Sequence, residues 1–198
     1  MVEHYYSKNP QAASHRRIVT TTLRDFSLSF LTDSGVFSKH EIDFGSKLLI
    51  ESFNEPEIPG DILDMGCGYG PIGIALSKSF PERQVKMVDI NERAVALTKD
   101  NIKNNGVSAI VRQSDLFEKV TGTFAAIVTN PPIRAGKKVV HGIFSESARF
   151  LDKNGELWVV IQKKQGAPSA LEYLRSIYGE VETVAKKKGY YVFRAKNI

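Results

Sequence analysis

The feature that most constrains the fold is an apolar run that leads into three alternating glycines, DILDMGCGYGPIGI at residues 61–74. Ile62, Leu63 and Met65 suit a strand that is covered on both faces, as the strands of a parallel sheet are. Glycines allow the backbone that follows to bend sharply and to approach a ligand closely. Pro71 suits the first helical turn, because the N–H that it lacks would have no intrahelical partner there. The stretch therefore predicts a buried strand, a glycine turn that cradles a nucleotide, and a helix.

Strands and helices alternate along the rest of the chain. The predicted strands are 84–89, 109–113, 124–129 and 156–162, the last after a turn at Asn154-Gly155, and the predicted helices are 71–79, 92–104, 139–150 and 168–178. This order predicts an α/β fold with a Rossmann-like, doubly wound and mainly parallel sheet. Segments 181–186 and 190–195 predict an antiparallel hairpin that closes the sheet.

The residues before the glycine turn predict a smaller extension. Two β-prone runs between residues 18 and 31 predict a β-hairpin, and Asp43 is placed to cap the helix that follows. We therefore expect an N-terminal hairpin and helix, residues 1–55, to pack on a core domain, residues 56–198, as one compact unit.

Composition narrows the class of protein. A length of 198 residues with 42% hydrophobic content suits one domain with a sizeable core. The 27 Lys and Arg exceed the 22 Asp and Glu, giving a net charge of +5, which favours a polyanionic partner such as nucleic acid, with ordinary solubility as the alternative. A single cysteine, Cys67, excludes an intramolecular disulfide, and the four scattered histidines leave no metal-ligand spacing.

The N-terminal residues lack the apolar core of a signal peptide, and no later apolar run approaches the ~20 residues of a membrane span. These features predict a cytoplasmic protein without a membrane partner.

The glycine turn fits two cofactors. GYGPIG, residues 68–73, matches the dinucleotide pattern G-x-G-x-x-G, whereas DMGCGYG, residues 64–70, is similar to the first motif of class I S-adenosylmethionine-dependent methyltransferases. The Asp64 carboxylate would repel a pyrophosphate, but it suits the amino and sulfonium groups of S-adenosylmethionine. The acidic residue therefore favours the methyl donor over a dinucleotide or a purely structural turn.

Further carboxylates follow the next two strands. Asp89 is placed to bind both ribose hydroxyls. The methyltransferase resemblance implies that Asp115 accepts a hydrogen bond from the adenine amino group. For each aspartate, a helix cap or a turn is the alternative role. Cys67 is interpreted as a space-filling residue rather than a nucleophile. The predicted donor-binding residues are Asp64, Gly66, Cys67, Gly68, Gly70, Asp89, Ile90, Ser114, Asp115, Leu116 and Asn130.

A second motif, Asn130-Pro131-Pro132-Ile133, follows the predicted strand 124–129. In a doubly wound sheet this strand lies beside the first core strand, so the motif is expected to face the methyl donor. The Asn130 side-chain oxygen and the Pro131 carbonyl are then rigid acceptors that can hold both hydrogens of an NH2 group as positive charge develops on its nitrogen. The four residues are the predicted catalytic residues, and neither a metal nor a general base is required.

This motif resembles that of the Asn/Asp-Pro-Pro-aromatic methyltransferases, which modify exocyclic amines of adenine or guanine or the glutamine amide of release factors. Ile133 replaces the aromatic residue that would stack on a flipped base, which makes adenine N6 a less favoured target. A merely rigid proline turn is the alternative reading of the motif.

Residues 32–38 and 43–49, with both motifs, resemble the RsmC-type ribosomal RNA guanine-N2 methyltransferases of the methyltransferase small domain family. The resemblance implies a class I catalytic domain over residues 56–198 and seven strands in the order 3-2-1-4-5-7-6, with the last antiparallel. Members of this family often carry a second, degenerate domain, for which this chain has no room. We therefore expect the catalytic half alone. The sequence leaves both a monomer and a homodimer open.

Basic residues follow two of the predicted strands. These predicted RNA-binding residues are Arg134, Lys137, Lys138, Lys163 and Lys164. They would contact phosphates near the site, with a solvated surface as the alternative.

The sequence as a whole predicts an S-adenosylmethionine-dependent methyltransferase that acts on guanine N2 of small-subunit ribosomal RNA. Protein glutamine-N5 methylation, adenine-N6 methylation and a non-catalytic donor-binding module remain the alternatives.

Overall fold

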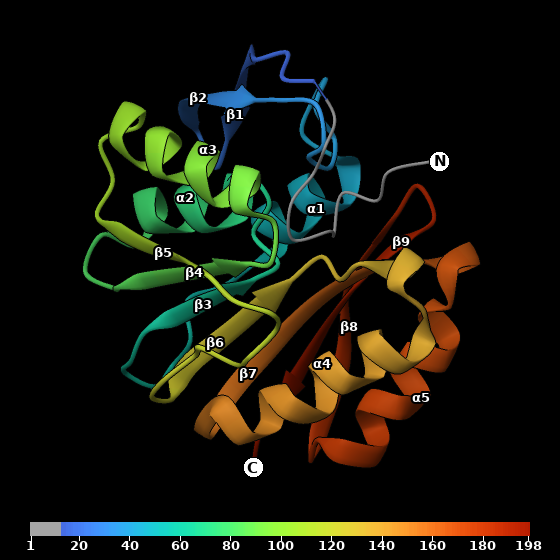
Figure 1. The fold of residues 1–198 in the computed structure, drawn as a ribbon. Helices are drawn as coiled ribbons and strands as arrows, with labels where there is room; N and C mark the ends of the chain where they lie inside the picture. Colours follow the sequence, from blue (N-terminus) through green and yellow to red (C-terminus); the bar gives the residue numbers. More distant parts are fainter. Residues whose placement is uncertain (1–12) are drawn as a thin grey trace.

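The computed structural model describes residues 13–198, which form a sheet between two layers of helices and a separate hairpin (Figure 1). The elements in chain order are β1 (Arg17–Leu23), β2 (Phe26–Thr32), α1 (Phe44–Ser52), β3 (Ile62–Met65), α2 (Pro71–Ser79), β4 (Val85–Asp89), α3 (Glu92–Asn104), β5 (Ala109–Gln113), β6 (Phe124–Thr129), η1 (Ile133–Ala135), α4 (Lys137–Phe150), β7 (Leu151–Gln162), η2 (Lys163–Gln165), α5 (Ala167–Ile177), β8 (Glu180–Lys187) and β9 (Tyr190–Lys196).

The seven strands of the main sheet have the order β5-β4-β3-β6-β7-β9-β8. Numbered from β3, this is 3-2-1-4-5-7-6, so the predicted fold class and strand order are confirmed. Strand β9 is antiparallel to both β7 and β8, whereas β3 is parallel to both β4 and β6. The carboxyl ends of β4, β3 and β6 therefore meet at one edge of the sheet, where the chain order reverses and doubly wound folds bind their ligands.

Each face of the sheet is covered by its own helices (Figure 1). Helices α1, α2 and α3 share a buried core with one set of strand side chains, and α4 and α5 share another core with the alternate set. Along β7, for example, Trp158 belongs to the first core and Val159 to the second. This alternation follows from the period of two along a strand, and it explains why the central strands are apolar throughout.

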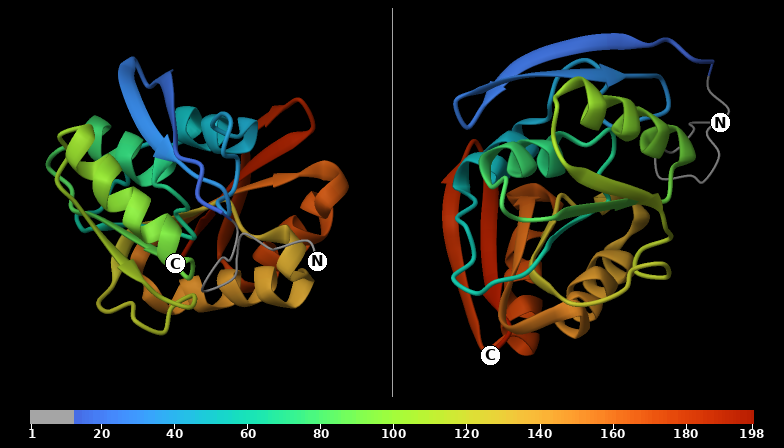
Figure 2. Two further views of the ribbon diagram at one scale, coloured as in Figure 1. Left: turned by 45° about the horizontal axis from the view of Figure 1, so that its top comes forward. Right: turned by 90° about the vertical axis from the view of Figure 1, so that its left-hand side faces the viewer.

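The hairpin of β1 and β2 lies outside the first helical layer, over α2 and α3 (Figure 2). Its buried residues Leu23, Leu28 and Phe30 belong to the same core as α1 and α2. Asn101 of α3 fixes the hairpin, because its side chain accepts from the Leu31 N–H and donates to the Leu31 carbonyl.

One predicted boundary is wrong. Strand β7 begins at Leu151 rather than at residue 156, so Asn154-Gly155 does not precede the strand but lies within it. Asn154 has φ 64°, and the pairing of β7 with β6 shifts register at this point. A Cβ on Gly155 would lie 2.9 Å from the carbonyl oxygens of Asp152 and Phe124, which explains the glycine. The turn residues thus form an irregularity within a continuous strand.

The other predicted elements have the observed type, and their ends differ by at most two residues, as helix and strand ends commonly do. The short 3-10 turns η1 and η2 were not predicted. Turn η2 follows β7 directly, whereas residues 130–132 separate η1 from β6, and each turn precedes a helix, α4 after η1 and α5 after η2.

Candidate functional site

A cavity lies where the carboxyl ends of β3, β4, β5 and β6 meet the N-terminal ends of the helices. Its lining residues come from segments 36–38, 65–69, 71–72, 88–91, 114–116 and 130–132, together with Asp43, Ser46, Ala94 and Ile143. Three of them are aspartates, Asp43, Asp89 and Asp115, and the described lining contains no lysine, arginine or histidine. Such a surface favours a cationic ligand and opposes a pyrophosphate.

The glycine turn forms one wall of this cavity. Gly66, Gly68 and Gly70 have φ values of 74°, 58° and 95°, in the left-handed region that favours glycine. A Cβ on Gly66 or Gly68 would meet nothing within 4 Å, whereas a Cβ on Gly70 would lie 2.9 Å from Ile74 Cδ1. The first two glycines thus leave space at the cavity wall, and Gly70, which is not a lining residue, is required by packing beneath α2.

Asp64 lies behind the glycine turn and does not line the cavity. Its side chain is fully buried, Oδ2 accepts from the Gly73 N–H at 2.8 Å, and Oδ1 has no hydrogen-bond partner within residues 13–198. Burial raises the pKa of Asp64 to about 7, the Gly73 N–H opposes this rise, and the Asp89 charge adds to it. Asp64 therefore bears on the site through the first turn of α2 that it holds, and not by direct contact with a ligand in the cavity.

Asp89 holds the turn together at the end of β4. Oδ2 accepts from the Gly68 N–H and Oδ1 from the Asn91 N–H, each at 2.8 Å. Burial raises the pKa of Asp89, and these backbone hydrogen bonds oppose the rise. Because a carboxylate oxygen can accept more than one hydrogen bond, Asp89 retains acceptor capacity toward the cavity that it lines.

The third loop, after β5, brings Ser114, Asp115 and Leu116 to the cavity. The Ser114 hydroxyl is used within the loop, since it donates to the Leu116 carbonyl and accepts from the Lys119 N–H. Asp115 is exposed. Ile90, after β4, also lines the cavity, as do Cys67, Gly66 and Gly68.

The second motif is divided between the cavity and the core. Asn130, Pro131 and Pro132 line the cavity, but Ile133 does not, because it begins η1 and packs on the core shared by α4 and α5. The Pro131 carbonyl accepts from the Ile133 N–H at 2.9 Å. One acceptor position on this carbonyl is therefore taken within the motif, and one remains for the predicted role as an acceptor.

The Asn130 amide is fixed by two residues that the sequence reading did not assign to the site. Its Nδ2 lies 2.7 Å from Asp43 Oδ2 and 3.0 Å from Ser46 Oγ. Asp43 is also the N-cap of α1, as predicted, and its side chain accepts from the Ser46 N–H. In the sequence, the capping role alone accounts for an aspartate at position 43, so its contact with Asn130 could not be predicted.

The predicted RNA-binding lysines and Arg134 lie outside the cavity. Residues 134, 137 and 138 are on η1 and the first turn of α4, and Lys163 and Lys164 are on η2, all exposed. Since β6 and β7 are parallel neighbours, both groups follow strands that end at the same sheet edge.

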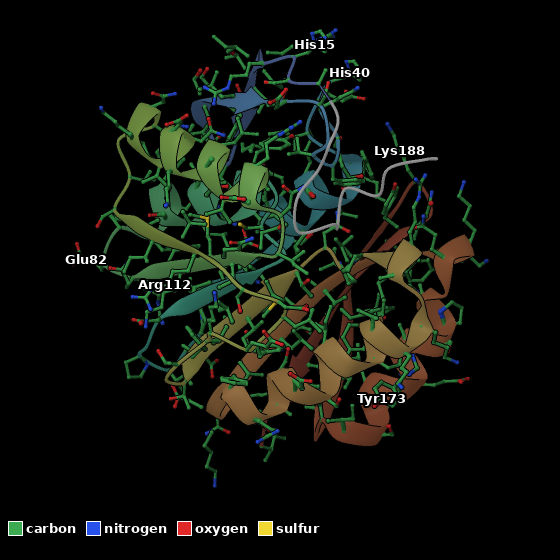
Figure 3. The ribbon with its side chains drawn as sticks, in the orientation of Figure 1. His15, His40, Glu82, Arg112, Tyr173 and Lys188 are labelled. Atoms are coloured by element: carbon green, nitrogen blue, oxygen red, sulfur yellow. The ribbon has the colours of Figure 1, made fainter. Side chains whose placement is uncertain are left out.

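The described residues contain no group of three His, Cys, Asp or Glu side chains that could hold a metal ion. His15 and His40 lie at the hairpin end of the molecule, at the top of Figure 3. Within residues 13–198, no helix is both long and apolar enough to span a membrane.

Comparison with known proteins gives a consistent result. The family model described as "Methyltransferase small domain" matches residues 27–194. The chain is 56% identical to YbxB of Bacillus subtilis, with both chains covered completely. It is 30% identical to ribosomal RNA small subunit methyltransferase C of Vibrio parahaemolyticus, over 89% of this chain and 52% of that protein.

Among solved structures, the T. thermophilus 16S rRNA N2 G1207 methyltransferase RsmC, in complex with AdoMet and guanosine, superposes with a TM-score of 0.83 at 26% identity. The match covers 96% of this chain and 52% of that one. The chain thus spans about half the length of these ribosomal RNA methyltransferases.

Proposed function

The chain belongs to the methyltransferase small domain family, and from this premise we propose that it transfers a methyl group from S-adenosylmethionine to guanine N2 of small-subunit ribosomal RNA. One observation carries the proposal. An acidic cavity without lysine, arginine or histidine in its described lining includes Asn130, whose amide nitrogen is held by Asp43 and Ser46. The first feature suits a sulfonium donor, and the second suits an amine acceptor of the methyl group.

We assign the donor to the glycine turn and the loops after β4 and β5. When bound, S-adenosylmethionine supplies an electrophilic methyl group. Asp89 would bind the ribose hydroxyls, Asp115 the adenine amino group, and Gly66 and Gly68 would leave room for the donor beside the turn. Asp64 would act from behind the turn by accepting from the Gly73 N–H in the first turn of α2, because its carboxyl group does not line the cavity.

We assign the acceptor nitrogen to Asn130 and Pro131. A guanine amino group is a poor nucleophile because its lone pair is delocalised into the ring. Acceptors that hold both of its hydrogens stabilise the positive charge that develops during attack, and they do so without reorganisation. Asn130 Oδ1 is one such acceptor, and the remaining acceptor position of the Pro131 carbonyl is the other.

The exposed cations on η1, α4 and η2 are proposed to contact RNA phosphates. Their positions after two parallel neighbouring strands support this role. That an extension, residues 1–55, packs on a catalytic domain, residues 56–198, as one compact unit also remains a proposal, and residues 1–12 of the extension lie outside the described residues. It is supported by the contribution of Asp43 and Ser46 to the cavity and by the core that the hairpin shares with α1 and α2.

The test is transfer of a labelled methyl group to three substrates prepared without methylation: naked small-subunit ribosomal RNA, assembled small subunits and a release factor. Digestion to nucleosides should give N2-methylguanosine from one of the ribosomal substrates. N6-methyladenosine or labelled release factor would reject the proposed target. Donor binding without transfer to any substrate would instead indicate a non-catalytic module.

A further inference from the structure

Asp43 and Ser46, at the start of α1, hold the amide group of Asn130, at the end of β6. Asp43 Oδ2 lies 2.7 Å from Asn130 Nδ2, and Ser46 Oγ lies 3.0 Å from it. All three residues line the cavity. Helix α1 precedes the first core strand, so a segment outside the glycine turn and the second motif contacts the first residue of that second motif.

The chemistry of these partners determines which end of the amide faces them. An ionised carboxylate can only accept, so the amide atom beside Asp43 must be the nitrogen. The Ser46 hydroxyl donates its hydrogen to Asp43 Oδ2 at 3.1 Å, which leaves its oxygen to accept from Asn130. Asn130 Nδ2 therefore donates to both residues, and Asn130 Oδ1 makes no hydrogen bond within residues 13–198.

Asp43 is itself held in place. Its Oδ2 accepts from the Ser46 N–H at 2.8 Å, which ties the carboxylate to the first turn of α1. Gly45 permits this arrangement, because a Cβ there would lie 3.2 Å from Asp43 Oδ2 and 2.9 Å from Tyr190 Cε1. The Asp43 carboxylate is thus fixed within the packed N-terminal turn of α1.

We propose that Asp43 is a positioning residue that, together with Ser46, sets the Asn130 amide so that its oxygen is the end available to the substrate amine. This inference rests on the proposed function. The reversed amide would present an NH2 group to the substrate NH2, with no acceptor between them. Donation to a carboxylate also polarises the amide and makes Oδ1 a stronger acceptor.

Asp43→Ser separates this role from helix capping. Serine is as good an N-cap as aspartate, but its shorter side chain cannot span the distance to Asn130. We expect kcat to fall by about 10- to 100-fold, the loss typical of a misplaced acceptor, while the Kd for S-adenosylmethionine changes less than about threefold. Asp43→Asn, which keeps an oxygen in reach of both Asn130 and the Ser46 N–H, should retain activity to within about fivefold.

Ser46→Ala provides a second variant that leaves the Asp43 carboxylate in place. It removes one of the two acceptors and should lower kcat by about 3- to 10-fold. If Asp43→Ser is unfolded at the assay temperature, Ser46→Ala decides the question. Wild-type kcat in every folded variant of this pair would overturn the proposal.

A double-mutant cycle tests whether Asp43 acts through Asn130. In an Asn130→Ala background, Asp43→Ser should change kcat less than about twofold, because the group that Asp43 positions is gone. Independent, multiplying losses would show that Asp43 has a separate role and would overturn the inference.

NMR keeps this inference distinct from the proposed function. The Asn130 side-chain amide signals, identified by their absence in Asn130→Ala, should be shifted downfield and protected from solvent exchange in the wild type, and should lose both properties in Asp43→Ser. Unprotected signals in the wild type would overturn the positioning role. A protein with these NMR properties that methylates no RNA would refute only the proposed function.

Discussion

The side chains of Asp43 and Asn130 are 2.7 Å apart, although 87 positions separate them in the chain. The first caps a helix that precedes the core sheet, and the second ends the strand beside the glycine-turn strand. Their contact joins the N-terminal extension to the motif that is proposed to bind the substrate. The site therefore depends on how α1 packs over the carboxyl edge of the sheet.

Replacing Asn130 should separate transfer from donor binding. Asn130→Ala removes an acceptor for the reacting amine, and we expect methyl transfer to fall by at least about 100-fold. The Kd for S-adenosylmethionine, measured by calorimetry, should stay within about threefold. Asn130→Asp is a useful companion, because it would place a second carboxylate against Asp43 and should also be inactive. Full activity in Asn130→Ala would refute the proposed mechanism.

Asp89→Asn should not behave as a conservative change. Both Asp89 oxygens accept from backbone N–H groups, so an amide NH2 would face the N–H of either Gly68 or Asn91. We expect donor affinity to fall by about 10- to 100-fold and the thermal midpoint to drop. Asp115→Asn is the matched control for stability. Because Asp115 is exposed, its replacement should change the free energy of unfolding by less than about 0.5 kcal/mol. Equal melting temperatures for Asp89→Asn and the wild type would contradict this account of the turn.

Asp64 should make stability depend on pH. Its carboxyl ionises near 3.8 when unfolded, and burial raises its pKa to about 7 in the folded protein. Between pH 3.8 and pH 7, the Asp64 carboxyl takes up a proton when the protein folds. The contribution of protonated Asp64 to the free energy of unfolding is therefore fully present below pH 3.8 and is lost as pH rises through 7.

Urea unfolding of the wild type and Asp64→Asn at pH 5 and pH 8 measures this effect. The asparagine keeps an acceptor for the Gly73 N–H but does not ionise. Its stability relative to the wild type should therefore increase by about 2 to 3 kcal/mol between the two pH values. A difference that is constant with pH would show that Asp64 is not the titrating group.

Two glycines in helices should respond to alanine in opposite directions. A Cβ on Gly73 in α2 would lie 2.6 Å from Met87 Cγ and 3.0 Å from Asp64 Oδ2, so Gly73→Ala should destabilise the protein by about 1 to 3 kcal/mol. A Cβ on Gly142 in α4 would meet nothing within 4 Å, so Gly142→Ala should stabilise by about 0.5 to 1 kcal/mol. Thermal melts of both variants distinguish these effects, and a stabilising Gly73→Ala would contradict the packing described for α2.

Local patterns predicted much of this protein. The period of two in the strands, the Pro71 start of α2 and the turn residues between elements are properties of neighbouring residues, so the strands, helices and their order could be predicted from the sequence. The same holds for the placement of the glycine turn and Asn130 at one sheet edge, because strand order in a doubly wound sheet follows from the connections. Asn154-Gly155 is the exception, since a turn signal cannot reveal whether the strand continues through it.

The tertiary structure decided how the predicted site residues divide into separate roles. It placed Asp64 behind the turn and Ile133 against the core of α4 and α5, because burial depends on what packs against a residue rather than on its neighbours in sequence. It also brought Asp43 and Ser46 to Asn130. A hydrogen bond across 87 positions leaves no periodic or local signal, and it forms only when a helix from one end of the chain packs against a strand end from another.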